Sequence, residues 1–359
     1  MKTNKINRMV ESVKLLNIVA IACLLVSLLI FLVSDEPGTA IYSFFIGPFT
    51  SIRRIGNIFE GAVPLIFTAL AVIMIFKCGQ FSMISEGAFF IGIMGAMIVA
   101  IACPLPPGIH ALVAIIFAGL LGAIAATIPA ALKLKWKVSE VVTSIMLNYV
   151  IQFFVIYMVN YHFRDPEASS LASLLIRDSA KLPVLVPKTK CHLGIIIALA
   201  FCLVEWFLVF RTRLGFKVRV VGDNLNFARY AGIKAPTVML IAQVIAGLVA
   251  GVGGGVEFLG MYTRFKWTAS PGYGWTGIAV ALLAKNNPAF VPLSALFLSY
   301  LDVGAAIMAR SSDVSSEMVQ IIQAVIMLMV AAEAFLGGWK QSLIEKQAAR
   351  EKAQEGGKA

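Results

Sequence analysis

The chain has 359 residues, of which 59% are hydrophobic and 14% are charged, and its formal net charge is +11. An ordinary soluble domain carries about 25% charged residues, so this composition excludes a soluble globular protein and indicates that lipid surrounds most of the chain. The basic excess does not indicate nucleic-acid binding. The lysines and arginines lie in short loops beside apolar runs, as they do at the cytoplasmic ends of membrane spans.

Ten apolar runs follow one another along the chain, most of them close to the roughly 20 residues that a spanning helix needs. They cover residues 15–33, 61–78, 88–104, 109–132, 141–159, 193–210, 238–259, 272–284, 289–309 and 318–338. Because backbone in lipid must satisfy its own hydrogen bonds, we expect an all-α integral membrane protein with about ten transmembrane helices. The first run is too long for a signal-peptide core and no small-residue cleavage pattern follows it, so we expect it to be retained. The eighth run is short and glycine-rich, and a half-helix is the alternative there.

The basic residues predict the orientation of these runs. With a cytoplasmic N-terminus, about twenty of the 30 lysines and arginines lie inside and about ten outside. This predicts cytoplasmic ends at 1–14 and 339–359 and a transmembrane domain over 15–338. Residues 160–192 form a polar external loop, which is either a docking surface for an extracytoplasmic partner or a simple connector. Residues 40–60, with Phe44, Phe45 and Phe49 near Arg53 and Arg54, are expected to contain an interfacial helix.

One polar and basic segment, residues 211–237, interrupts the apolar pattern. Its stretch FKVRVV is expected to be strand-like and to end at Gly222. Asp223 or Asn224 then caps a short helix at about 225–231, and the glycine that follows ends it. A short helix of this kind fits a groove on a soluble partner, and an ordinary basic loop is the alternative.

Polar residues within apolar runs cost roughly 2.5–3.5 kcal/mol at a helix centre, so they are expected to face protein or a watery cavity. Glu86 and Glu257 lie near the ends of runs, where solvent can satisfy them, whereas Asp302 lies deeper and suits a cavity or a paired site. Tyr273 and Trp275 are suited to stacking on a flat solute. Placement at the membrane interface is the alternative for these aromatic residues.

The chain shows no pattern for chemistry of its own. It lacks GxxxxGK[ST], so we expect no ATP binding through a P-loop. The glycines between 247 and 255 lie inside an apolar run and predict close helix packing instead. The histidines and cysteines have no metal-ligand spacing, and no catalytic arrangement is recognisable, so neither an enzyme nor a metal or cofactor site is expected.

Four stretches carry a family resemblance. They are GQFSMISEG at 79–87, EVVTSIMLNY at 140–149, GFKVRVVGDNLNFARYAGI at 215–233 and GYGWTGIAVALLAKNNP at 272–288. Together they resemble the permease subunits of bacterial ABC importers of the ribose and nucleoside type, within the simple-sugar and branched-chain-type permeases. The nearest likeness is to permeases encoded with a basic-membrane-protein-like lipoprotein. It extends from about residue 60 to residue 335.

The resemblance implies a type II ABC importer permease in the bacterial plasma (inner) membrane, with both termini cytoplasmic. Its partners would be an ABC ATP-binding subunit, a second permease subunit in a heterodimer, an extracytoplasmic substrate-binding lipoprotein and membrane lipid. It implies ATPase-coupling contacts from Asp223, Asn224, Ala228, Arg229, Tyr230 and Gly232. It also implies a translocation path near Glu86, Asn148 and Thr276, to which the residue chemistry above adds Tyr273, Trp275 and Asp302.

The solute is expected to be a nucleoside or a simple sugar such as ribose, and a riboflavin-like vitamin with ring and ribityl parts is the alternative. Ser82, Ala88 and Thr276 depart from the family pattern, which leaves selectivity open. An ion-coupled secondary transporter is the rival from another class, with Glu86, Asp302 or Glu333 as an ion or proton site. The docking segment at 211–237 argues against that rival.

Overall fold

The computed structural model describes residues 36–187 and 189–314, together with single residues between 27 and 34 and between 318 and 328. Over this part of the chain the named elements are helices, and the only extended pairings are the isolated bridges Arg164–Ser173 and Val184–His192. The chain divides into two compact units, Pro48–Val303 and Met1–Gly47 with Gly304–Ala359. The features described below belong to the first unit unless stated otherwise.

Seven helices in the described residues are long and apolar enough to cross a membrane, as in a multi-pass membrane protein. They are α3 (Ile52–Lys77), α4 (Ile84–Ala102), α5 (Ile109–Trp136), α6 (Glu140–His162), α7 (Gly194–Arg211), α10 (Ala235–Met261) and α12 (Val291–Ser311), the last preceded by the 3₁₀ turn η3 (Pro288–Phe290). Each contains or overlaps one of the predicted runs. The runs at 15–33 and 318–338 lie almost wholly outside the described residues, so the total of ten spans stays a prediction.

The stretch 40–60 is divided among three elements, and an interfacial position for any of them stays a prediction. Its second half belongs to α3, which begins at Ile52 and carries Arg53 and Arg54 in its first turn. The helix therefore extends beyond its apolar run, because charged residues at a helix end can remain in water. The preceding residues form α2 (Pro37–Phe45), which lies in the other unit, and the 3₁₀ turn η1 (Gly47–Phe49).

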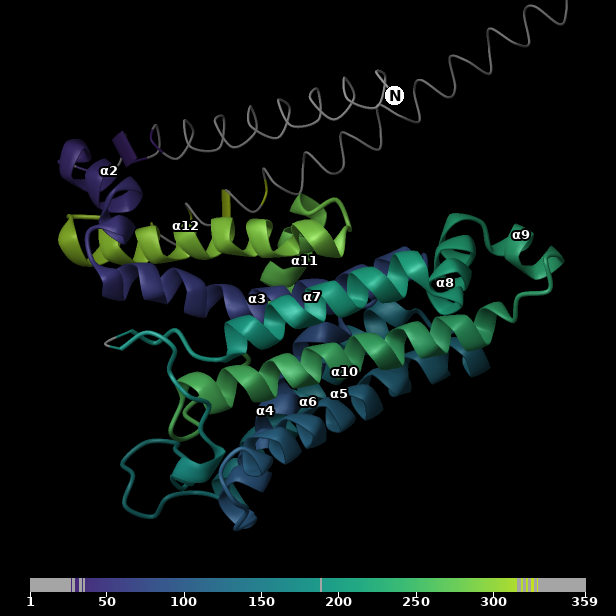
Figure 1. Cartoon of the computed structure of the whole chain (residues 1–359), viewed down its shortest axis with the longest axis horizontal. Coiled ribbons are helices and arrows are strands. Elements are labelled where there is room, and N and C mark those ends of the chain that lie inside the picture. The colour runs from purple at the N-terminus through teal and green to yellow at the C-terminus, as the bar shows by residue number, and fades with distance from the viewer. Residues whose placement is uncertain are drawn as a thin grey trace, which may run out of the picture. The chain divides into compact units, whose positions relative to one another are not determined.

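Helix α10 is the central element of the unit Pro48–Val303 and packs against α3, α4, α5 and α7 (Figure 1). Glycines allow this close approach. A Cβ at Gly251 would meet the carbonyl oxygen of Ala118 in α5, and one at Gly254 would meet that of Phe89 in α4. The predicted role of the 247–255 glycines in helix packing is therefore confirmed.

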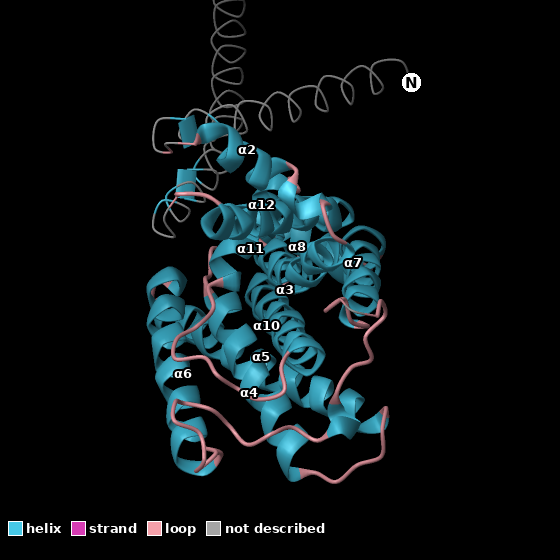
Figure 2. Ribbon diagram, turned by 90° about the vertical axis from the view of Figure 1, so that its left-hand side faces the viewer, coloured by secondary structure: helices cyan, strands magenta, loops and turns pink. Residues whose placement is uncertain are grey.

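Two stretches of non-helical backbone enter this helical unit. Residues 78–83 join α3 to α4, and residues 262–272 lead from α10 into the short helix α11 (Tyr273–Leu283), which packs on α3 (Figure 2). Helix α11 has 11 residues, which corresponds to about 16 Å and is too short to cross a hydrocarbon core of about 30 Å. The half-helix alternative for the run at 272–284 is thus the one that the length of α11 supports.

The two ends of the helical unit are built differently. Helices α8 (Arg213–Asp223) and α9 (Leu225–Tyr230) lie at the end where α10 begins, and the loop 163–193 lies at the other end (Figure 1). This loop is tied to the segment after α10, since Ser173 N–H donates to Phe265 O at 3.0 Å and Ile176 N–H to Thr263 O at 3.0 Å. The loop is therefore an integral part of the fold.

The expectation that FKVRVV is strand-like is wrong, because these residues belong to α8. Gly215, Val218 and Val221 are buried at helical spacing along it. The valines suggested a strand by propensity, and packing of one helical face against α7, α10 and α3 decided otherwise.

Candidate functional site

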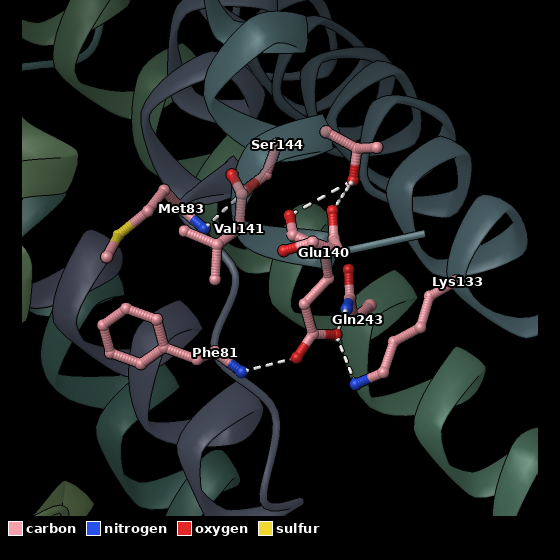
Figure 3. Close-up of polar contacts among 9 residues, drawn as sticks. Phe81, Met83, Lys133, Glu140, Val141, Ser144 and Gln243 are labelled. Atoms are coloured by element: carbon pink, nitrogen blue, oxygen red, sulfur yellow. Dashed lines mark hydrogen bonds and ion pairs between the residues drawn. The ribbon is translucent and has the colours of Figure 1, made fainter. Parts of the chain in front are cut away.

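Helix α6 holds the non-helical backbone between α3 and α4 with polar side chains on one of its faces. Phe81 N–H donates to Glu140 Oε1 at 2.7 Å, and Met83 N–H donates to Ser144 Oγ at 3.0 Å (Figure 3). One turn further along, Asn148 accepts from Gly87 N–H at 3.0 Å and donates to Met83 O at 2.8 Å. The spacing of four residues places these three side chains in a row, which we call the α6 clamp.

Glu140 joins four parts of the unit at once. Besides Phe81 it accepts from Lys133 Nζ at 2.8 Å, at the end of α5, and from Gln243 Nε2 at 3.2 Å, on α10 (Figure 3). Its side chain is 8% exposed. A buried carboxylate needs this many partners, because burial removes the water that otherwise solvates the charge.

Glu86 holds the other non-helical stretch. It is 4% exposed in the first turn of α4, and its carboxylate accepts from Ser270 Oγ, from Gly272 N–H at 2.8 Å and from Gly274 N–H. Gln152, one turn beyond the clamp on α6, accepts from Ser270 N–H at 3.2 Å. The expectation that solvent satisfies Glu86 is therefore wrong, because backbone donors at the start of α11 do so.

The predicted short helix in the polar segment is confirmed as α9. Asn224 is its N-cap and accepts from Phe227 N–H at 3.0 Å. Gly232 follows with a φ of 74°, and Ile233 N–H reaches back to Ala228 O at 2.9 Å. The backbone of α9 is thus satisfied within the chain at both ends.

The outer surface of α8 and α9 combines aromatic and charged side chains. Tyr230 is 93% exposed, Phe227 61% and Phe216 57%, and Arg229 beside them is also exposed. Of the residues predicted to couple to an ATPase, five are exposed and lie on or beside α9: Asp223, Asn224, Arg229, Tyr230 and Gly232. Ala228 is fully buried, so its side chain faces the rest of the chain.

Helix α8 touches the end of α3 through glycine. A Cβ at Gly222 would meet the carbonyl oxygen of Lys77, and one at Gly79 would meet the backbone of Gly222. This contact lies directly beside the 78–83 stretch that the α6 clamp holds. Helices α8, α3 and α6 therefore meet around this stretch.

The predicted path residues fall into separate groups. Glu86, Tyr273, Trp275 and Thr276 come together around the start of α11, where the Tyr273 ring lies 5.5 Å from that of Phe89 and Trp275 is 46% exposed. Asn148 lies on α6, and the oxygen and the nitrogen of its side-chain amide are both hydrogen-bonded to backbone. Asp302 is an exposed residue of α12.

Sequence reasoning missed four residues of this site: Glu140, Ser144, Gln243 and Ser270. Gln152, in contrast, is expected from the sequence to face protein or a watery cavity, because it is a polar residue within an apolar run. The sequence did contain a signal for Glu140 and Ser144, since they form a polar row at intervals of four with Asn148 and Gln152. Gln243 and Ser270 stand alone in their segments, so no pattern marked them.

The match to known families covers most of this architecture. The model of the branched-chain amino acid transport system permease component matches residues 54–331. The chain belongs to this family of permeases. The matched range includes the α6 clamp, α11 and the α8–α9 pair, so these features lie within the family domain.

Curated relatives point the same way. The chain is 34% identical over 312 residues to a glucose ABC transporter permease of Haloferax volcanii, covering 84% of this chain and 82% of that one. It is 35% identical over 314 residues to a guanosine ABC transporter permease of Bacillus subtilis, covering 85% and 88%. A nucleoside ABC transporter permease of Lactococcus lactis is 31% identical over 299 residues, covering 80% and 82%. No solved structure matches the chain significantly.

Proposed function

We propose that this permease is the membrane subunit of an ATP-driven importer and that α8 and α9 form the docking site of a separate ATP-binding subunit. The observation that carries the proposal is the surface of α9. Its backbone is capped within the chain, while Phe227, Arg229 and Tyr230 extend outward. Exposed aromatic and arginine side chains are the types that dominate the energy of protein interfaces.

The contact between Gly222 and the end of α3 supports a mechanical role for this surface. Movement of the docked subunit would displace α8, and α8 would displace the 78–83 stretch that α6 holds. ATP binding and hydrolysis on the partner would thereby change which side of the membrane has access to the path. This permease itself would carry out no covalent chemistry.

The proposed assembly follows from the orientation that the basic residues predict. Placing α8 and α9 in the cytoplasm puts both termini there and puts the loop 163–193 on the outer face of the plasma membrane. That loop would receive an extracytoplasmic substrate-binding lipoprotein. A second, similar permease subunit would complete the path as a heterodimer.

The proposed solute is a nucleoside or a simple sugar, since the relatives named above are permeases for guanosine, nucleosides and glucose. The aromatic group at the start of α11 supports a solute with a ring. Trp275 is 46% exposed there, beside the half-buried Tyr273 and Thr276. An exposed indole stacks on planar rings, a contact worth about 1–3 kcal/mol per base.

Reconstitution tests the proposal. The permease is placed in liposomes with its ATP-binding subunit, second permease and binding protein, and uptake of radiolabelled guanosine, ribose, glucose and riboflavin is measured. We expect ATP-dependent uptake of a nucleoside or a sugar. Uptake of riboflavin and of none of the other compounds would show that the proposed solute is wrong. Uptake by the permease alone in an ion gradient would overturn the proposal of an ATP-driven importer.

Arg229→Glu tests the docking site directly. Reversing an exposed charge in the interface is expected to lower the amount of co-purified ATP-binding subunit about tenfold or more, because like charges across an interface cost several kcal/mol. Arg164→Glu is the matched control, since Arg164 is exposed at the opposite end of the unit. Equal co-purification for both variants and wild type would remove the assignment.

A further inference from the structure

Helix α11 lies between two sharp turns of the backbone. Its N-cap Gly272 has a φ of 83°, and Lys285 and Asn286, just beyond its C-terminal end, have φ values of 52° and 53°. Left-handed conformations are uncommon for residues other than glycine, so two in succession mark an abrupt change of chain direction. The chain therefore changes direction at both ends of this 11-residue helix.

Two glycines bring the N-terminal half of α11 close to its neighbours, and Val280 and Leu283 are buried further along the helix. A Cβ at Gly274 would meet the backbone of Glu86, and one at Gly277 would meet the side chain of Thr68 on α3. Helix α11 therefore lies close against α4 and α3 at its N-terminal half.

Polar contacts also hold the N-terminal end of α11. Glu86 accepts from Gly272 N–H and Gly274 N–H, two of the amides that α11 leaves unpaired at its N-terminus, and from the hydroxyl of Ser270 just before it. A negative carboxylate at a helix N-terminus is also favoured by the helix dipole. Because Glu86 is buried within α4, its side chain ties α11 to a membrane-spanning helix.

We infer that Glu86 is a positioning residue for transport: its carboxylate latches α11 to α4 and thereby holds Trp275 and Thr276 in place along the solute path. The inference rests on the proposed function, because it assigns α11 a part in that path. Glu86 does not contact solute in this arrangement, since its oxygens are occupied by backbone and hydroxyl donors. The latch opens when these donors leave the carboxylate, and α11 then moves about its two terminal turns.

Glu86→Gln tests the latch, because it keeps the shape of the side chain and removes its charge. Glu205→Gln is the matched control: Glu205 is 4% exposed on α7, and neither of its carboxylate oxygens has a hydrogen-bond partner within the described chain. Both variants are purified in the full transporter complex. Hydrogen exchange at the amides of Gly272 and Gly274 reports directly on the latch, and uptake per ATP hydrolysed reports on transport.

The side-chain nitrogen of Gln cannot accept a hydrogen bond, so we expect Glu86→Gln to expose at least one of the two amides to exchange. We also expect it to lower uptake about tenfold or more while ATP hydrolysis continues, because chemistry on the partner does not need α11. Glu86→Asp, which retains the charge, is expected to restore part of the uptake. Glu205→Gln is expected to match wild type in both measurements. A purely structural role would lower complex yield without changing uptake per ATP.

Unchanged protection of the two amides in Glu86→Gln, or their exposure with uptake within about twofold of wild type, would overturn the inference. If Glu86→Gln fails to assemble, Ser270→Ala decides instead, because it removes one donor and leaves the carboxylate in place. Retained uptake per ATP together with faster exchange in that variant would likewise overturn it. Absence of ATP-driven uptake by wild type would refute the proposed function alone, since the exchange measurement does not depend on it.

Discussion

The α6 clamp and the α8–α9 surface use polar residues in opposite ways. In the clamp, Glu140, Ser144 and Asn148 are directed at backbone groups of the same chain, and Glu140 is nearly buried. On α9, capping satisfies the backbone locally, and the remaining side chains face outward. Both regions lie within one family domain, so polarity by itself does not distinguish an internal fastening from a contact surface.

The difference teaches how a membrane subunit accommodates irregular backbone. Non-helical backbone lacks the hydrogen bonds that a helix supplies, so other parts of the chain provide its partners. The clamp and Glu86 do this for the 78–83 and 262–272 stretches. On α8 and α9, by contrast, Asp223, Arg229 and Tyr230 are exposed.

The largest effect is expected from Glu140→Ala in the clamp. The change leaves Lys133, the Gln243 amide and Phe81 N–H without their shared acceptor, and removing one partner of a buried pair costs about 3–5 kcal/mol. Thermal unfolding of the detergent-solubilised protein measures it. Thr143→Ala is the control, because the Thr143 hydroxyl donates only to carbonyls at the start of its own helix. Similar midpoints for the two variants would mean that the clamp is not an internal fastening.

A smaller effect is expected from Gly222→Ala at the junction of the two regions. The new Cβ would collide with the carbonyl oxygen of Lys77, and overpacking of this kind costs about 1–3 kcal/mol. Gly38→Ala is the control, since a Cβ at this helical position meets nothing within 4 Å. We also expect Gly222→Ala to lower uptake per ATP. Normal coupling in this variant would show that the α8–α3 contact does not link the two regions.

The smallest effect is expected from Asn224→Ala on the α8–α9 surface. It removes the N-cap of α9, which is worth about 1 kcal/mol, and the cap lies on an exposed helix of six residues. Hydrogen exchange should rise within α9 while the global unfolding midpoint changes little. Asn226→Ala, an exposed neighbour inside α9, is the control. A large fall in the unfolding midpoint would show that the α8–α9 surface contributes to global stability as the clamp does, which would contradict the proposed difference.

Much of the fold was predictable because lipid imposes a simple rule on the sequence. Long apolar runs predicted seven of the helices, and the glycines between 247 and 255 predicted their close packing. The capping residues predicted α9, since caps act through neighbours in sequence. The early start of α3 and the helical state of FKVRVV were not predicted, because charged or β-branched residues conceal a helix that packing stabilises.

The sequence by itself determined that the chain is helical and spans a membrane, that the polar segment 211–237 carries exposed side chains, and to which family the chain belongs. Apolar length, charge and local capping decide the first two properties and four short sequence stretches indicate the third, and all of these can be read along the chain. Only the tertiary structure decided what Glu86 and Asn148 do, since both were candidates for the solute path and both bind backbone in the folded chain. Their partners are backbone amides and carbonyls, which every residue carries, and at Gly272 and Gly274 they lie more than 180 positions away from Glu86. No residue type in the sequence therefore marks them, and only folding brings them within reach.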